Sequence, residues 1–510
     1  MTGSFDRLAG QEAGPHRRRE PKKERRPREL TIAPAPGPIV GDGRYSGYDE
    51  PMVVFGTTGV GKTTWALRNI VRSPGPAIVS SMKPELFAYS AGWFISQGRP
   101  VWVFDAEGAL NPEPDMQMRW SPITSCVVPE RPPHLPETAN VAKSSFGGYV
   151  LVDLAQKMAE RLSYGATTNP EWRPATASVI APMLVAAAIG GVRDVKKLIS
   201  WTEGPSSALQ ALDVLRMAGL PELRSRLNTA FGPASATGGA NRQSYANLFS
   251  DALRGFTNPY VAQMCLSGPQ EAFDVRRFVA ERGVLYLVGS SESQEVIASI
   301  IATMVEDIVE RARQIQKPLR PPLCLWLDEV ANTAPLSSLP KMFSTGRGDG
   351  IYISVVLQSY SQAADRWGPG GAATIQANAT VELHLAGSKD QAMLSWLERA
   401  AGRREVVNRS VSYGADRSRS DSAAWAKEAA YDARELRSLP PRHAWLLYRN
   451  EDPAKAHLAP WWDCSERAAI ELSWEMASRW VPPELMPLPS PPRRSNSTLL
   501  KRLFTSKSPL

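Results

Sequence analysis

The sequence predicts an α/β fold with a mainly parallel central sheet, an inserted all-helical domain and disordered basic tails. Short apolar runs rich in Val, Leu and Ile recur along the chain, and helical segments lie between several of them. Runs of this kind are typical of parallel strands that helices cover on both faces. The runs span residues 51–56, 77–81, 101–105, 284–289, 323–329, 351–358 and 381–387. One helix is predicted after Gly61 and another from about Ser293 to Gln316.

The composition is that of a globular protein, with 43% hydrophobic and 22% charged residues among 510. The net charge of +8 comes from the two ends, because residues 31–480 hold 45 basic and 45 acidic side chains. The high isoelectric point therefore does not indicate that the body is a nucleic-acid surface. Four scattered cysteines exclude a disulfide framework and favour a reducing compartment. With no apolar signal segment, the chain is expected to be cytoplasmic.

Changes in composition divide the chain into five predicted parts. Residues 141–262 are rich in Ala, Leu and Met at helical spacing and contain few strand-like runs. Within them an uncharged stretch, 174–192, contains Pro182 and two glycines, which favours a buried helix over a membrane span. The eight Lys and Arg residues from Arg17 to Arg28 suit contact with DNA or anionic lipid and a solvated tail equally well. The parts are a disordered basic arm (1–48), the first part of the nucleotide-binding domain (49–140), the helical insert (141–262), the second part of that domain (263–479) and a Pro-rich basic tail (480–510).

A phosphate-binding loop is predicted where the sequence reads G-T-T-G-V-G-K-T. It follows an apolar run and opens a helix, which is the context that this motif requires. Its glycines let backbone N–H groups turn toward a polyphosphate, and the helix N-terminus adds partial positive charge. Lys62 is placed to reach the β- and γ-phosphates of ATP, and the Thr63 hydroxyl to bind Mg²⁺. The predicted nucleotide-binding residues are Gly56, Thr57, Thr58, Gly59, Val60, Gly61, Lys62, Thr63 and Thr64.

An acidic pair, Asp328–Glu329, ends the buried run that starts at residue 323. Ligands of parallel sheets bind at the carboxyl edge of the strands, where this pair is expected to lie. Asp328 is therefore predicted to hold Mg²⁺ through its water shell, and Glu329 to polarise the attacking water as general base. Asp105 and Glu107 follow another apolar run and compete for the metal role, although they are not adjacent.

Two further polar side chains are candidates for catalysis. Gln358 ends the run 351–358, where an amide can sense the γ-phosphate, orient the water or simply satisfy the end of a strand. Arg347 lies in S-T-G-R-G-D-G, and the flanking glycines predict a mobile loop. An arginine in such a loop can reach a neighbouring subunit's phosphate. On the residues alone, an ordinary solvated arginine is the simpler interpretation.

The block 325–368 resembles the signature of the type IV secretion coupling proteins, which are the conjugative DNA-transfer ATPases of the TraG/TraD type. The matching positions are Asp328, Glu329, Asn332, Pro335, Arg347, Gln358 and Gln362. The resemblance covers about residues 50–125 and 262–460. It implies a RecA-like motor domain with an all-helical insert, and a ring, usually hexameric, with ATP sites between subunits. It also makes Arg347 a candidate finger acting in trans.

These features predict an ATP hydrolase that moves DNA in conjugative transfer and links the DNA-processing complex to a transfer channel, with ATP and Mg²⁺ as cofactors. The expected partners are DNA, a relaxase or DNA-processing complex, and further copies of the chain in a hexamer. Family members usually carry an N-terminal membrane anchor, which this sequence lacks. Recruitment to the cytoplasmic face of the membrane is therefore expected to need a membrane-anchored partner or a tail. Two alternatives remain, an ATPase that moves or recruits proteins for secretion and a nucleotide-gated adaptor without hydrolysis.

Overall fold

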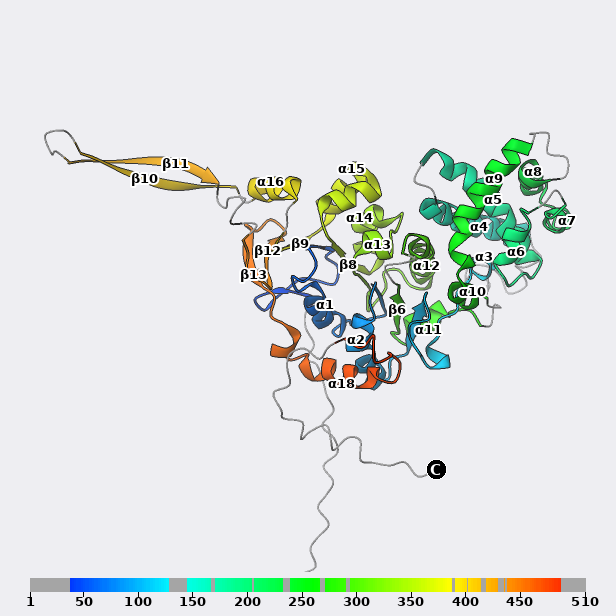
Figure 1. Cartoon of the computed structure of the whole chain (residues 1–510), viewed down its shortest axis with the longest axis horizontal. Helices are drawn as coiled ribbons and strands as arrows, with labels where there is room; N and C mark the ends of the chain where they lie inside the picture. The colour runs from blue at the N-terminus through cyan, green and yellow to red at the C-terminus, as the bar shows by residue number, and fades with distance from the viewer. Residues whose placement is uncertain are drawn as a thin grey trace, which may run out of the picture. The chain divides into compact units, whose positions relative to one another are not determined.

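The computed structural model describes residues 37–127, 145–166, 170–203, 206–232, 239–266, 271–289, 294–387, 390–400, 402–413, 419–429, 435 and 438–487. A nine-stranded sheet lies at the centre of this part of the chain (Figure 1). In spatial order its strands are β13 (Ala454–His457), β12 (His443–Tyr448), β9 (Val381–Leu385), β3 (Met52–Phe55), β8 (Ile351–Leu357), β7 (Leu323–Leu327), β4 (Ala77–Ser81), β6 (Val284–Val288) and β5 (Val101–Asp105).

The seven strands from β9 to β5 are parallel, whereas β12 and β13 pair antiparallel beside β9. Each of the seven parallel strands lies within one of the seven apolar runs. The predicted α/β fold with a mainly parallel sheet is therefore confirmed. Since all seven strands point the same way, the residues that follow them gather at one carboxyl edge.

Helices cover both faces of the sheet. On β3, Met52 and Val54 face a core shared with α1 (Lys62–Ile70), α2 (Glu85–Ser96) and α18 (Arg467–Ala477). Val53 and Phe55 face the opposite core. The alternation along the strand thus buries both of its faces, as expected for a central parallel strand. The second core is shared with α12 (Gln294–Ile315), α13 (Val330–Thr333), α14 (Leu339–Asp349), α15 (Tyr360–Asn378) and α16 (Gln391–Ala400).

Between β5 and β6 the chain forms a group of helices, called here the helical insert (Figure 1). Its helix α5 contains the uncharged stretch and is buried at Ile180, Leu184 and Val185. No helix among the described residues has the length and apolar character needed to cross a membrane. The boundaries at 141 and 262 remain a prediction. The elements are η1 (Pro114–Met116), α3 (Pro122–Cys126), α4 (Ser145–Ala166), η2 (Pro170–Trp172), α5 (Arg173–Ile189), α6 (Lys196–Ser200), α7 (Leu209–Met217), α8 (Pro221–Phe231), α9 (Gly239–Leu253), η3 (Arg254–Thr257), α10 (Pro259–Cys265) and α11 (Val275–Ala280).

Some elements have no clear signal in the sequence. They are β1 (Ile39–Gly41), β2 (Arg44–Tyr45), the antiparallel pair β10 (Arg403–Tyr413) and β11 (Arg419–Ala429), β12, β13 and η4 (Trp461–Asp463).

Residues 37–48 belong to the predicted disordered arm, yet Ile39 is buried and its carbonyl accepts a hydrogen bond from Trp65 Nε1 at 2.8 Å. Likewise Trp480 and Val481, at the start of the predicted tail, are buried. Residues 1–36 and 488–510, with most of the tail charge, lie outside the described residues.

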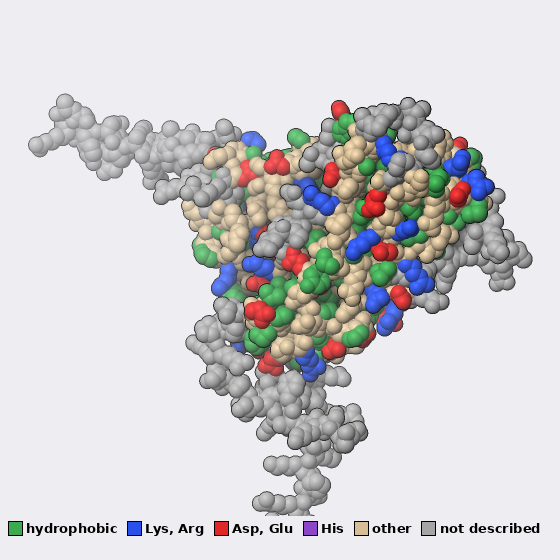
Figure 2. All heavy atoms as spheres, turned by 45° about the vertical axis from the view of Figure 1, so that its right-hand side comes forward, with side chains coloured by type: hydrophobic (Ala, Val, Ile, Leu, Met, Phe, Trp, Pro, Cys, Tyr) green, Lys and Arg blue, Asp and Glu red, His purple; other side chains and the backbone are tan. Residues whose placement is uncertain are grey.

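The surface charges and the cysteines can be compared with what the composition predicts. Figure 2 shows basic and acidic side chains mixed over the visible face of the described residues, as a neutral body predicts. All four cysteines are free, and Cys126, Cys265 and Cys324 are buried.

Candidate nucleotide-binding site

The predicted phosphate loop connects β3 to α1 at the carboxyl edge of the sheet. Gly56, the first residue after β3, donates its N–H to the carbonyl of Leu357 at the end of β8, at 3.0 Å. Gly59 and Gly61 have φ angles of 84° and 104°, a left-handed conformation that glycine adopts without strain. The loop then enters α1 at Lys62, so the free N–H groups of the first helical turn lie at the loop.

Lys62 connects the loop to the acidic pair on β7. Its Nζ donates to the carbonyl of Gly56 at 2.8 Å and lies 3.8 Å from Glu329 Oε1. The Lys62 side chain is only 8% exposed, so its charge acts in a largely desolvated setting. The motif residue and the predicted general base, far apart in sequence, are therefore neighbours in the structure.

Asp328 follows β7 and is half-buried. Its N–H donates to the carbonyl of Ser80 at 3.1 Å, and its own carbonyl accepts from Thr333 Oγ1 at 2.7 Å. Burial raises the pKa of this carboxyl from 3.8 to about 6, with Lys62 opposing the rise and Glu329 adding to it. Its Oδ1 is buried and accepts no hydrogen bond from the described residues. A carboxylate oxygen without a donor, beside a phosphate loop, fits a hydrated Mg²⁺ ion.

Glu329 adopts an unusual backbone conformation. Its φ and ψ are 47° and 46°, which is rare for a residue other than glycine and is maintained only when the surroundings require it. Its carbonyl accepts hydrogen bonds from the N–H groups of Asn332 at 2.8 Å and Thr333 at 3.0 Å, which begins α13. This tight turn directly after β7 brings the Glu329 carboxylate within reach of Lys62.

A chain of amides joins three elements at the same edge. Gln362 on α15 donates its Nε2 to Asn332 Oδ1 at 3.3 Å, and its Oε1 accepts from the N–H of Gln358 at 3.0 Å. Because Phe55 and Leu357 are paired, Gln358 lies next to Gly56 at the start of the loop. Gln358 thus lies beside the phosphate loop, and the Gln362 side chain accepts a hydrogen bond from its backbone N–H.

The predicted mobile loop at Arg347 is wrong, because this residue lies in the last turn of α14. Leu339, Met342, Phe343 and Gly346 are buried at helical spacing, which outweighs the low helix propensity of the glycines. Arg347 is 73% exposed and forms an ion pair with Asp49 at 2.9 Å. Since Asp49 precedes β3 and α14 leads into β8, Arg347 lies at the amino edge of the sheet, opposite its own phosphate loop.

The rival acidic residues have a structural role. The Asp105 carboxylate accepts from the N–H groups of Leu110 at 2.6 Å and Glu107 at 3.2 Å, so it closes the turn after β5. β5 is the far edge strand, with four strands between it and β3. Asp105 and Glu107 are therefore not part of the site around Lys62.

Two residues that sequence reasoning missed flank the loop. A Cβ atom on Gly61 would lie 3.6 Å from Cγ of Arg442, whose guanidinium covers the Trp462 ring at 4.9 Å. Arg442 has a φ of 62°, a second strained residue beside the loop. Glu466, fully buried, forms ion pairs with Arg68 of α1 and with Arg72 just after that helix, and so attaches this C-terminal segment to the loop's helix. No local pattern predicts these contacts, since each joins the loop or its helix to a segment that is distant in sequence.

The parallel sheet, the glycine loop and the acidic pair define a phosphate-loop NTPase fold. Residues 322–441 match the family model described as the TraM recognition site of TraD and TraG. The resemblance to the TraG/TraD coupling protein family that the sequence predicts is thereby confirmed.

Solved structures of coupling proteins share this fold. Bacterial conjugative coupling protein TrwBdeltaN70, in its unbound monoclinic form, is 18% identical with a TM-score of 0.58, covering 81% of this chain and 85% of that chain. Plasmid coupling protein TrwB in complex with the non-hydrolysable ATP analogue ADPNP is 17% identical with a TM-score of 0.56, covering 81% and 86%. TrwB in complex with ADP and Mg²⁺ is 18% identical with a TM-score of 0.55, covering 81% and 85%. No curated protein matches the chain.

Proposed function

We propose that this chain is an ATP hydrolase that moves DNA in conjugative transfer and links the DNA-processing complex to a transfer channel. The observation that carries the proposal is the meeting of Lys62, Asp328 and Glu329 at the carboxyl edge of the sheet. A buried cation, a carboxylate with a free oxygen and a second carboxylate are the groups that phosphoryl transfer to water requires. The likeness to TrwB, which was solved with an ATP analogue and with ADP and Mg²⁺, supports ATP as the substrate.

Each residue has a defined task in this proposal. The loop N–H groups and Lys62 hold the β- and γ-phosphates, which releases Lys62 Nζ from the carbonyl of Gly56. Thr63 and Asp328 hold Mg²⁺, which supplies positive charge to the phosphate oxygens when bound. Glu329 accepts a proton from the attacking water, and Gln358 orients that water. Before ATP binds, the ion pair with Lys62 holds the Glu329 side chain in place.

The position of Arg347 supports a ring with sites between subunits. At the amino edge of the sheet it is directed away from its own loop, and it is exposed. An arginine there serves catalysis only in a neighbouring subunit, as trans fingers do in other NTPases. A hexamer is the assembly that we propose. The match to a TraM recognition site supports a protein partner from the conjugation machinery, and a relaxase and a membrane-anchored protein are further proposed partners.

The decisive experiment is ATP hydrolysis by the purified chain with and without DNA, across a range of salt concentrations. We expect DNA to stimulate hydrolysis, and the stimulation to fade with salt, because DNA contacts are mostly to phosphates. Lys62→Ala is the control and should abolish turnover. Hydrolysis that responds to a polypeptide and not to DNA would instead assign a protein-moving ATPase. If no cargo releases phosphate, the chain is a nucleotide-gated adaptor.

A further inference from the structure

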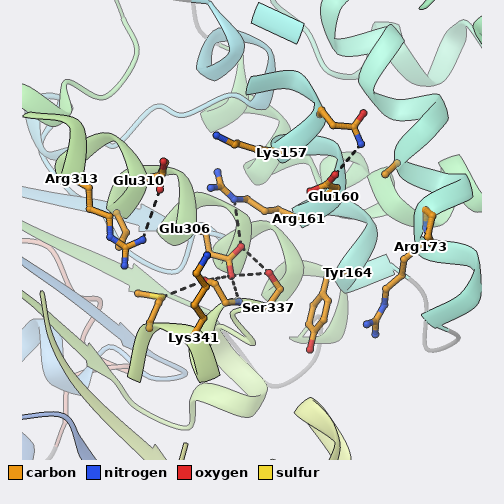
Figure 3. A pocket seen from close by; sticks show the side chains of 16 residues that line it. Lys157, Glu160, Arg161, Tyr164, Arg173, Glu306, Glu310, Arg313, Ser337 and Lys341 are labelled. Carbon is orange, nitrogen blue, oxygen red and sulfur yellow. Dashed lines mark hydrogen bonds and ion pairs between the residues drawn. The ribbon is translucent and has the colours of Figure 1, made fainter. Parts of the chain in front are cut away.

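A cavity of about 710 Å³ lies between the helical insert and the motor part of the chain (Figure 3). Its walls come from α4 and the start of α5 on one side, and from α12 and the start of α14 on the other. Its volume is in the range of sites that hold small ligands. The cavity is remote from the phosphate loop, none of whose residues line it.

The acidic groups of this cavity are already satisfied. Glu306, buried on α12, accepts hydrogen bonds from Ser337 Oγ at 2.9 Å and from the N–H and Oγ of Ser338, both at 2.7 Å. It also pairs with Arg161 at 3.5 Å. Glu310 pairs with Arg313 at 3.8 Å, and Glu160 accepts from Gln156 Nε2 at 3.0 Å. Each of these carboxylates therefore already has a hydrogen-bond donor or a cationic partner.

The basic groups are only partly satisfied. Five of them line the cavity, namely Lys157, Arg161, Arg173, Arg313 and Lys341, against three acids. Lys157 pairs with Asp153 at 2.9 Å, and Arg313 also pairs with Asp349 at 2.9 Å. Neither Arg173 nor Lys341 forms an ion pair with any residue that the structure describes. Among the described residues, the cavity thus carries two positive charges that no carboxylate pairs with.

Arg173 shows most directly what the cavity lacks. Its guanidinium lies over the Tyr164 ring at 4.1 Å, which fixes the plane of its N–H groups (Figure 3). Its Nε is buried and has no acceptor among the described residues. A buried donor without an acceptor is costly, and an arginine fork held on an aromatic ring is preorganised for a bidentate anion such as phosphate.

We propose that this cavity is a second phosphate-binding site, in which Arg173 and Lys341 bind the phosphate groups of a nucleic-acid strand or of a free polyphosphate. The site is independent of the phosphate loop and does not require the proposed function. Ser337 and Ser338 in its wall follow the acidic pair in sequence and directly precede α14, which carries Arg347 in its last turn. An anion bound here therefore contacts the segment that connects Glu329 to Arg347.

The test measures binding by the full chain carrying Lys62→Ala, so that the phosphate loop contributes little. The probes are a labelled single DNA strand of about 20 nucleotides and inorganic tripolyphosphate. In that background, Arg173→Gln with Lys341→Gln is expected to weaken binding about tenfold. For the strand it should lower the slope of log affinity against log salt by about 1.4, which corresponds to two lost phosphate contacts.

A matched control removes the same charge from elsewhere on the helical insert. Lys196 and Arg224 are exposed and lie outside the cavity, so Lys196→Gln with Arg224→Gln should leave binding within about twofold. Arg173→Lys with Lys341→Arg keeps both charges but removes the planar fork at 173, so it should bind more tightly than the glutamine double variant and less tightly than the Lys62→Ala parent. Because Lys341 is exposed, the single variant Lys341→Gln is expected to fold and provides a second test of the site. Thermal melting of every variant shows whether it is folded.

Loss of strand binding alone identifies nucleic acid as the ligand, and loss of tripolyphosphate binding alone identifies a free polyphosphate. Either result supports the site. The proposal is overturned when the double variant and Lys341→Gln bind both probes as tightly as the Lys62→Ala parent. If DNA does not change ATP hydrolysis by the unmutated chain, the proposed translocation of DNA is contradicted. The second phosphate-binding site would still stand, because it is measured by binding in the Lys62→Ala background.

Discussion

At the scale of single residues, the two adjacent carboxylates of the site, Asp328 and Glu329, have different surroundings. Glu329 lies within ion-pair distance of Lys62, whereas Asp328 has one buried carboxylate oxygen without a donor among the described residues. Burial raises the pKa of Asp328 and thereby weakens its charged form unless a cation is present. The two acids therefore suit different tasks, metal binding for Asp328 and proton transfer for Glu329.

Glu329→Gln is expected to bind ATP yet hydrolyse it about 10²–10⁴-fold more slowly, because an amide cannot accept the proton of the attacking water. Fluorescent-nucleotide binding and phosphate release measure the two steps. Glu107→Gln, an acid after the far edge strand β5, is the matched control and should hydrolyse ATP normally. Normal hydrolysis by Glu329→Gln would refute its role as base.

Asp328→Asn is expected to stabilise the Mg²⁺-free protein at neutral pH. The folded pKa, about 6, lies above the unfolded value of 3.8, so the stability that this carboxyl contributes is complete below about pH 4 and is lost as pH rises through 6. An asparagine does not titrate. The free energy of unfolding of Asp328→Asn should therefore exceed that of the unmutated protein by about 3 kcal/mol at pH 8.

The measurement is urea unfolding of both proteins at pH 4 and pH 8 in the presence of a chelator. The difference between the two proteins should shrink to about 0.6 kcal/mol at pH 4, where the aspartate is protonated in the folded state and about two-fifths protonated in the unfolded state. A constant difference at both pH values would contradict the raised pKa.

At the scale of elements, α14 shows packing overriding local propensity. Glycines at 346, 348 and 350 weaken this helix locally, yet its apolar residues are buried against the sheet. Gly350 then ends it with a φ of 72°, and Asp349 in its last turn pairs with Arg313 and Lys317, each at 2.9 Å. The helix holds Arg347 in a fixed place, where the sequence alone suggested a mobile loop.

Two glycines of this helix should respond in opposite directions to alanine. At Gly350 a Cβ atom would lie 2.4 Å from the backbone of Leu319 in a left-handed conformation, so Gly350→Ala should destabilise the protein by more than about 2 kcal/mol. At Gly348 nothing lies within 4 Å of such an atom, so Gly348→Ala should stabilise it by about 0.5–1 kcal/mol. Urea midpoints measure both, and equal shifts would contradict the helix end at Gly350.

At the scale of the whole molecule, the two edges of the sheet have separate tasks. The carboxyl edge carries the loop and the acidic pair, and the amino edge carries Arg347. One chain therefore contains both halves of a proposed composite site but cannot join them itself. In the ring that we propose, the amino edge of one subunit would meet the carboxyl edge of the next.

Arg347→Ala is expected to lose DNA-stimulated hydrolysis, and mixing it with Glu329→Gln subunits should restore part of that activity. In a mixed ring some sites combine an intact base from one subunit with an intact arginine from its neighbour. Asp49→Asn is the control, because it breaks the exposed ion pair with Arg347 but leaves the arginine. Equal loss in Asp49→Asn would assign Arg347 a structural role, and mixtures without recovery would argue against a trans site.

Patterns of neighbouring residues in the sequence were enough to predict the phosphate loop and the parallel strands. The phosphate loop consists of adjacent residues whose motif has a physical reason, and the seven parallel strands are continuous apolar runs because both of their faces are buried. Since parallel strands place their carboxyl ends at one edge, the meeting of Lys62 with Glu329 also followed from the sequence.

Tertiary structure alone decided the rest. The helix at Arg347, the ordered residues 37–48 and the contact of Arg442 with the loop depend on segments that are distant in sequence. The same holds for the cavity, whose walls come from four helices. The physical reason is that burial and charge pairing across such distances are set by the packed fold, whereas a local window of sequence contains only propensity and periodicity.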